Sequence, residues 1–240
     1  MRYALVGLAV MACGRLGFNA EPGSGPADAS RDAAIDASGP PVAPQFVQYA
    51  DTVNMLSDGL ATSYTMDVTA GDLLVVCVGI NGQLLVTLTD ATGDAFTTLG
   101  PLLQDGQAMY TAYAIAATSG PESVGVTFDG SAYGALHLHE YADVDLVAPL
   151  DTNAANTGSS VGSDVIEVSL TTATANELLF VYAVSTDGAA TAGTGFNPRS
   201  SIAADISEDR IEAAPGAYEA TASNSGTPWE IQALAFRGHD

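Results

Sequence analysis

One phrase occurs twice in this 240-residue chain and constrains its fold more than any other feature. TAGDLLVVCVGI at residues 69–80 returns as TANELLFVYAV at residues 174–184. Each copy is a turn followed by an apolar run that is too short to cross a membrane and is rich in Val, Leu and aromatic residues. Such a run is typical of a strand that is buried on both faces of its sheet. The two copies therefore predict two equivalent core strands, with the rest of the chain arranged around them.

From residue 45 onward the chain reads as short strands separated by turns, and no segment keeps a helical period for three turns. The Asn81-Gly82 pair predicts a hairpin between the first core strand and the apolar run that follows it. Ser123–Phe128 and Ala135–Tyr141 predict a second pair of strands on either side of a short loop. The polar stretch 143–163 reads as a bridge between two halves.

The two halves resemble each other beyond the repeated phrase. Ala114–Phe128 resembles Arg210–Ala222, and Leu136–Tyr141 resembles Ile231–Phe236, in the same order along the chain. The alternative is that any two β-rich stretches look alike at this level of comparison. A true pseudo-repeat would bury the apolar side of each half. It predicts an all-β fold: a two-sheet antiparallel β-sandwich, jelly-roll-like, with two pseudo-repeated halves.

The charge of the chain restricts its partners. All six basic residues are Arg, whereas 28 residues are acidic, so the formal net charge is −22. Such a surface repels the phosphates of nucleic acids and anionic lipid headgroups, so we expect no nucleic-acid partner. An excess of acidic residues is typical of a protein that stays soluble in an extracellular environment where the salt concentration varies. A specific cationic partner is the alternative that stays open.

The first 43 residues read as an export signal and a tether. Residues 1–12 (MRYALVGLAVMA) combine one Arg with a short apolar run, as a signal peptide does. Val10–Cys13 resembles a bacterial lipobox, which implies that Cys13 is lipidated. The protein is then an outer-membrane lipoprotein or is secreted, and an ordinary signal peptide cleaved near Ala20 is the alternative. Residues 13–43 predict a disordered tether rich in Ala, Gly, Pro and Asp, and residues 44–240 the β-sandwich domain.

Six phrases are spread over residues 45–238: GDLLVV, TDATGDAF, HEYADVDLVAPLD, NELLF, EDRIEAAPGAYEAT and WEIQALAF. Together they resemble an uncharacterised β-sandwich domain that recurs in secreted and surface proteins of high-GC soil bacteria. The resemblance implies a jelly-roll-like fold and an extracytoplasmic location. It implies no functional residue, because that domain has no assigned chemistry.

Two histidines and a set of aspartates suit a metal ion. His137 and His139 are alternate residues of a predicted strand, so their imidazoles point to the same side of the sheet. Asp143, Asp145 and Asp151 in the bridge offer the carboxylates that calcium prefers, as do two acids in the earlier turn 90–94. The alternatives are a polar sheet face for the histidines and solvated loop acids. The sequence predicts no cofactor, and a structural calcium ion is the alternative that stays open.

Tyr133 and Trp229 fall at matching places in the two halves, each just before a closing strand. Exposed aromatic rings at the rim of a jelly roll stack on sugar faces in carbohydrate-binding modules, so both residues are candidates for ligand binding. The alternative is that both rings are core anchors at the starts of strands.

The motifs of catalysis are weak. Gly158–Gly162 (GSSVG) matches the Gly-x-Ser-x-Gly pattern of serine hydrolases, but it lacks the preceding strand and following helix that this pattern needs. No spacing pairs two glutamates in one cleft as a glycosidase requires. We therefore expect a non-enzymatic cell-surface lipoprotein whose β-sandwich binds a glycan or a surface protein, or has a structural or adhesin role. The alternative is an extracellular polysaccharide hydrolase on a jelly-roll scaffold.

Overall fold

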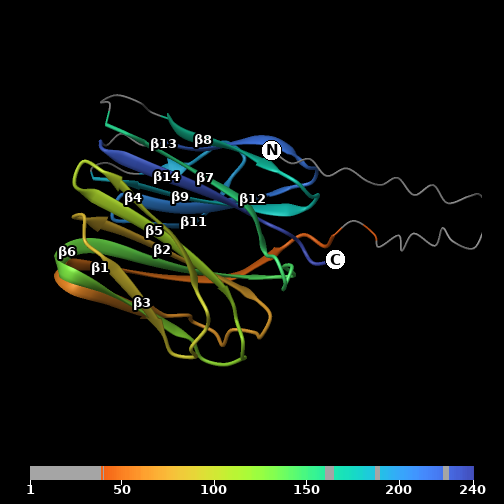
Figure 1. The fold of residues 1–240 in the computed structure, drawn as a ribbon, viewed down its shortest axis with the longest axis horizontal. Coiled ribbons are helices and arrows are strands. Elements are labelled where there is room, and N and C mark those ends of the chain that lie inside the picture. The colour runs from red at the N-terminus through yellow and green to blue at the C-terminus, as the bar shows by residue number, and fades with distance from the viewer. Residues whose placement is uncertain (1–38, 40, 160–164, 187–189, 224–226) are drawn as a thin grey trace, which may run out of the picture. The chain divides into compact units, whose positions relative to one another are not determined.

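β-Strands are the only regular secondary structure in the part of the chain that the structure describes (Figure 1). The structure is a computed structural model, and it describes residues 39, 41–159, 165–186, 190–223 and 227–240. All strand pairs among these residues are antiparallel, which confirms the predicted all-β sandwich. None of these residues belongs to a helix long and apolar enough to span a membrane. The predicted signal peptide, Cys13 and nearly all of the tether lie outside the described residues.

The first half of the fold contains six strands. They are β1 (Gln45–Ser63), β2 (Leu73–Asn81), β3 (Val86–Asp90), β4 (Thr97–Gln104), β5 (Gln107–Ile115) and β6 (Ser123–Ala142). Five of them form a sheet in the order β1-β6-β2-β5-β4, and β3 pairs with the first part of β6. The ladder between β1 and β6 shifts register around Met55–Gly59. This bent pair carries both strands from the five-stranded layer into a second layer, where β3 joins them.

The second half repeats this arrangement. Its described strands are β7 (Leu150–Gly158), β8 (Val165–Thr172), β9 (Glu177–Ser185), β10 (Thr191–Ala192), β11 (Asn197–Ile202), β12 (Asp205–Glu212), β13 (Gly216–Ser223) and β14 (Trp229–Phe236). The sheet order β11-β12-β9-β14-β7 matches β4-β5-β2-β6-β1, and the small sheet β10-β13-β8 matches the second layer of the first half. The pseudo-repeat is therefore present in the topology. The described strands form three sheets in place of the two expected: the first half is one sheet, because β1 and β6 run unbroken through both of its layers, and the second half has two separate sheets.

Three clusters of buried apolar side chains hold the layers together. The first-half core, which includes Val76, lies inside the first half. The second-half core, which includes Leu179 and Trp229, lies inside the second half. The central core, which includes Val75 and Phe180, joins the five-stranded layers of the two halves. Each half is thus a small sandwich with its own core, and the two sandwiches pack against each other.

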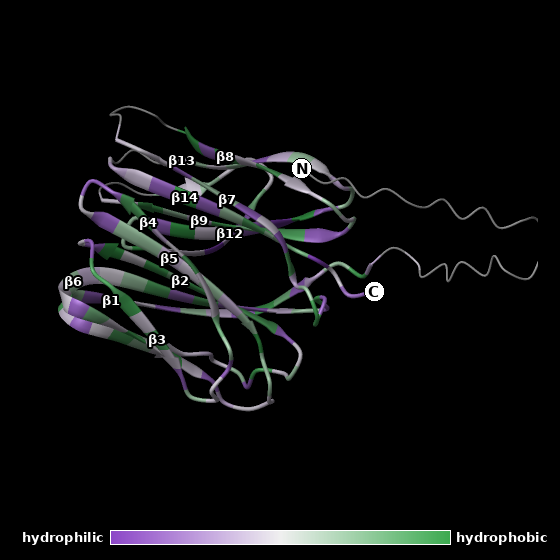
Figure 2. Ribbon diagram, in the orientation of Figure 1, coloured by the Kyte–Doolittle hydropathy of each residue, from purple (hydrophilic) through white to green (hydrophobic). Residues whose placement is uncertain are grey.

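The three cores explain why the repeated phrase is apolar throughout. Along β2, Leu74 faces the first-half core and Val75 faces the central core. Along β9, Leu179 faces the second-half core and Phe180 faces the central core. Both strands are therefore buried on both faces. By contrast, every second residue of β8 is exposed, and the strand alternates between hydrophobic and hydrophilic residues (Figure 2).

Two local strand predictions are wrong. No hairpin forms at Asn81-Gly82, because β3 pairs with β6 instead of β2, and the Gly82 N–H donates to the Gly106 carbonyl (2.6 Å). Ser123–Phe128 and Ala135–Tyr141 are not a pair but two parts of the single strand β6. The bent β1 runs beside β6 and supplies backbone partners on both sides of the expected loop.

The predicted polar bridge contains a strand, β7. This strand lies at the edge of its sheet with β14 as its partner, and polar side chains suit such an edge position. The fold also begins before residue 44. Val42 forms a bridge with His239, and the Pro41 carbonyl accepts a hydrogen bond from Asn176 Nδ2 (2.6 Å).

Candidate functional site

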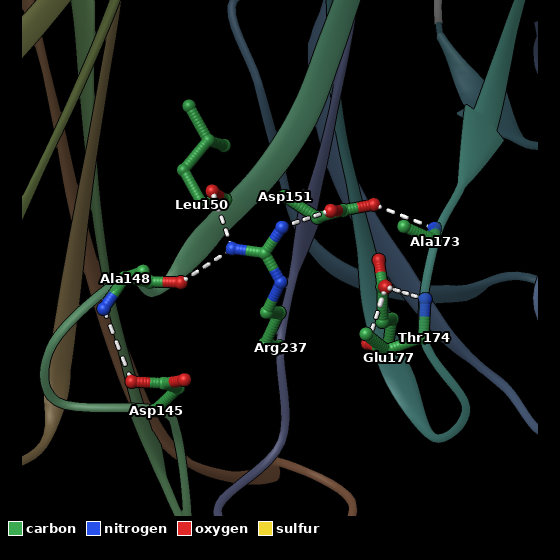
Figure 3. Close-up of polar contacts among 8 residues, drawn as sticks. All are labelled: Asp145, Ala148, Leu150, Asp151, Ala173, Thr174, Glu177 and Arg237. Carbon is green, nitrogen blue, oxygen red and sulfur yellow. Dashed lines mark hydrogen bonds and ion pairs between the residues drawn. The ribbon is translucent and has the colours of Figure 1, made fainter. Parts of the chain in front are cut away.

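Two aspartates of the predicted bridge site, Asp145 and Asp151, have separate partners (Figure 3). Asp145 Oδ1 accepts hydrogen bonds from two backbone N–H groups, including that of Ala148 (3.0 Å), and these bonds lower the pKa of the carboxyl. Asp151 accepts a hydrogen bond from the Ala173 N–H (2.7 Å) through one oxygen and pairs with Arg237 through the other. The two carboxylates are therefore committed to different protein groups.

Arg237 supplies the positive charge beside Asp151 (Figure 3). Its guanidinium donates to the carbonyls of Ala148 (2.9 Å) and Leu150 (3.3 Å) as well as to Asp151. Asp143 has a positive φ of 60°, and its backbone carbonyl accepts a hydrogen bond from the His239 N–H (2.9 Å). Among the described residues, the acids that group closely enough for a metal ion do not include these three aspartates.

Replacing Arg237 with Gln is expected to lower the free energy of unfolding by about 2 kcal/mol. The Asp151 side chain is only 4% exposed, so it would lose its countercharge while staying buried. Urea denaturation followed by the fluorescence of Trp229, the single tryptophan, measures the loss. A double-mutant cycle with Asp151→Asn isolates the ion pair, and strict additivity of the two changes would contradict the expectation.

A different group of acids does converge. Asp90, Asp94 and Glu122 each offer a carboxylate oxygen, and these oxygens lie within 4.8 Å of one another. The Thr92 hydroxyl oxygen lies 3.1 Å from Asp90 Oδ2, 3.1 Å from Asp94 Oδ2 and 2.5 Å from Glu122 Oε2. Such oxygens are the ligands that calcium prefers. The sequence pointed to the turn but missed Glu122. This residue lies beside the turn because the start of β6 pairs with the end of β3. A structural calcium ion stays the alternative to having no cofactor.

His137 and His139 lie in the central layer with no exposed surface. Their rings are nearly parallel, with centroids 6.5 Å apart. His137 Nδ1 lies 2.9 Å from Ser200 Oγ, and His139 Nε2 lies 2.8 Å from Ser207 Oγ. Burial, and then the neighbouring His137, lower the pKa of His139. The described residues bring no third ligand to form a metal group with them, and both imidazoles instead connect the first half to serines of the second.

Ser200, His137 and Asp205 have the composition of a catalytic triad but not its hydrogen bonds. His137 Nε2 lies 3.8 Å from Asp205 Oδ2, and its other nitrogen faces Ser200. The Ser200 hydroxyl donates to Asp51 Oδ2 (2.5 Å), whereas a nucleophilic serine donates to the histidine. These polar groups therefore tie the halves together.

Trp229 does not lie at the surface. Its side chain is 8% exposed and belongs to the second-half core. It pairs with Gly158, where an added Cβ would lie 2.3 Å from the indole ring. This close approach explains the glycine that opens the Gly-x-Ser-x-Gly match, while residues 160–162 of that match lie outside the described residues. The prediction that Trp229 stacks on a sugar is wrong, because a buried ring offers no face to a ligand.

Tyr133 lies at the rim of a groove between the two halves. Its side chain is 47% exposed and stands directly opposite Met55 of β1 and Asn81 of β2, so the three residues form a row across three strands. Met55 is 82% exposed. All three residues line the groove, which has a volume of about 270 Å³.

The next row on the same face of the sheet also lines the groove, and two of its three residues are small. Val53, Ala135 and Gly79 oppose one another on β1, β6 and β2, and all three line the groove. A Cβ added at Gly79 would lie 2.4 Å from Asp205 Oδ2 and 2.8 Å from the Tyr182 hydroxyl. Glycine at this position therefore leaves space for polar groups of the second half.

Asp205 forms part of the opposite wall of the groove. Its Oδ2 accepts a hydrogen bond from the Tyr182 hydroxyl (2.7 Å), and burial raises the pKa of its carboxyl. Glu230 is paired with Val184 of β9, and burial, followed by the nearby Asp205, raises its pKa to about 8. Sequence reasoning missed Asp205 and Gly79. The repeat carried a signal for the glycine, since Gly79 stands where the second copy has Val184.

No protein-family model, curated protein or solved structure matches this chain. The resemblance to a surface β-sandwich domain of soil bacteria therefore stays an expectation. The geometry of the groove carries the functional argument.

Proposed function

We propose that this protein is a non-enzymatic binding module that takes one sugar unit of an extracellular glycan in the groove at Tyr133. The observation that carries this proposal is the row of Met55, Tyr133 and Asn81 at the rim of the groove. An exposed aromatic ring offers an apolar face to a sugar ring, and an amide side chain offers hydrogen bonds to sugar hydroxyls. A volume of about 270 Å³ is slightly below the usual range for drug-sized ligands, which suits a single sugar ring.

The location in this proposal rests on the sequence. A lipid on Cys13 would anchor the chain to the outer membrane, and residues 13–43 would hold the groove away from it. The net charge of −22 favours an exterior ligand that is neutral or cationic. A surface protein as partner, or a structural or adhesin role, is the alternative within the same class.

The second candidate, a polysaccharide hydrolase, has weaker support. It needs two carboxyl groups that face one cleft. Asp205 lines the groove, whereas Glu230 has no exposed surface and does not line it. This arrangement favours binding over hydrolysis.

Replacing Tyr133 with Ala is expected to weaken glycan binding by about tenfold or more, because the stacking face is lost. A glycan array identifies the ligand, and isothermal titration calorimetry measures its affinity. Tyr49→Ala is the matched control, since Tyr49 is 44% exposed on β1 but does not line the groove. A blank array, or binding that survives in Tyr133→Ala, would contradict the proposal. Release of sugar from the bound glycan would instead support the hydrolase.

A further inference from the structure

Two carboxylates of β12, Asp205 and Asp209, lie on the same side of the strand between the two halves. Each accepts a hydrogen bond of 2.7 Å from a tyrosine hydroxyl, Asp205 from Tyr182 and Asp209 from Tyr141. Asp209 also has a full countercharge, because Arg199 donates to its two oxygens through Nε (2.6 Å) and Nη2 (2.9 Å). Both aspartates therefore have a tyrosine partner, but they differ in their basic partner.

Asp205 has no guanidinium partner among the described residues. Its basic neighbour is His137, whose Nε2 lies 3.8 Å away, beyond hydrogen-bond distance. Glu230 adds a second buried carboxyl group, whose pKa is raised by burial and then by the nearby Asp205. This end of the interface thus holds two carboxyl groups for one imidazole. It is also the end where the groove opens onto Asp205.

We propose that the groove binds its glycan through a protonated amino group, which takes at Asp205 the place that Arg199 takes at Asp209. This inference rests on the proposed function and names its substrate class, a sugar with a free amine such as glucosamine. Hydrogen bonds between charged groups are about twice as strong as neutral ones. An acetylated or neutral sugar has no charged amine, so it would lose this charge-assisted contact. Gly79 makes room for the carboxylate itself, since any Cβ there would lie 2.4 Å from Asp205 Oδ2, and Asp205 is one of the residues that line the groove.

The test compares three trisaccharides of equal length on the whole protein by isothermal titration calorimetry in 150 mM NaCl. They are the glucosamine trimer, its fully N-acetylated form and cellotriose. We expect the glucosamine trimer to bind about tenfold more tightly than the other two, as a charge-assisted hydrogen bond implies.

Three variants locate the effect. Asp205→Asn is expected to remove the preference for the amine and to leave the affinity for the acetylated trimer within about twofold. Glu219→Gln removes one exposed carboxylate of β13 and should keep the preference, so it controls for net charge. Ala203→Leu narrows the groove while leaving the carboxyl of Asp205 in place, and it should weaken binding of the glucosamine trimer. If Asp205→Asn does not fold, the comparison of the free and acetylated trimers decides on the amine contact, and Ala203→Leu decides whether the groove is the site.

The outcomes separate the two proposals. Equal affinity for the free and acetylated trimers, with loss of both in Tyr133→Ala, would overturn the amine contact and leave the binding module in place. If none of the three trisaccharides binds and the glycan array is blank, the proposal of a glycan-binding module would itself be overturned. A preference that persists in Asp205→Asn but disappears in 500 mM NaCl would reflect net charge and overturn the amine contact. If a lysine peptide binds in a manner that depends on Asp205 and no sugar binds, the assignment of a glycan as the ligand would be overturned.

Discussion

Lowering the pH from 8 to 5 is expected to raise the free energy of unfolding by on the order of 5 kcal/mol. Three buried carboxyl groups are responsible. Burial raises the pKa of Glu208 and of Glu230 to about 8, and burial together with Glu140 raises that of Asp72 to about 7. The ordinary values are 4.5 for Glu and 3.8 for Asp, so the folded state binds these protons more tightly than the unfolded state. Their stabilising contribution is therefore complete below about pH 4 and is lost as the pH rises through 7 to 8.

One buried histidine acts in the opposite direction. Burial and the neighbouring His137 hold the pKa of His139 well below its ordinary value of 6.5. The contribution of His139 is therefore present above pH 6.5 and is lost as the pH falls. This loss comes from one histidine, whereas three carboxyl groups contribute to the gain. The net effect of mild acid is stabilising.

Urea denaturation at pH 5, 6, 7 and 8, followed by Trp229 fluorescence, measures this dependence. Glu208→Gln should be more stable than the unaltered protein at pH 8 and should show a weaker dependence on pH. The Gly193 N–H that donates to Glu208 (2.8 Å) still finds an acceptor in the amide oxygen of glutamine. Glu219→Gln, at an exposed position, should keep the original slope. A free energy of unfolding that is constant or rises from pH 5 to 8 would contradict the prediction.

The elements that were predictable from sequence are those with a strong local pattern. The second core strand was expected from the phrase at residues 174–184 and occupies Glu177–Ser185, because burial on both faces leaves a continuous apolar run. The Asn81-Gly82 signal failed because strand pairing is decided by distant partners. β3 pairs with β6, and nothing local in the turn records that choice. β7 was missed because an edge strand needs no apolar face to be paired.

The candidate site was only half predictable for a related reason. Tyr133 and Trp229 occupy similar sequence positions, yet one ring is half exposed and the other lies in a core. The difference depends on Gly158, which has no Cβ and therefore allows β7 to approach the indole ring closely. Asp205 was not predictable, because its proximity to the groove depends on how the two halves pack. Only the packed halves show that Gly79 leaves room for its carboxyl.

Replacing Phe180 with Ala is expected to cost about 3–5 kcal/mol and to separate the unfolding of the two halves. Phe180 is fully buried in the central core. Its ring lies edge-on to two rings of the first half, with centroid distances of 5.0 Å to His139 and 6.2 Å to Tyr141. Removing it weakens the contact between the halves. The first-half and second-half cores do not contain this residue, so each half keeps most of its own packing.

Two probes distinguish this outcome from simple destabilisation. Trp229 fluorescence reports on the second half, where the ring is buried, and far-ultraviolet circular dichroism reports on both halves. In Phe180→Ala the two transitions in urea should no longer coincide. Leu136→Ala is the matched control, because Leu136 is equally buried but belongs to the first-half core. It should lower stability by about 2–5 kcal/mol, with the central core intact and the two transitions still coincident. Coincident transitions in Phe180→Ala would show that the halves unfold as one unit even when their central contact is damaged.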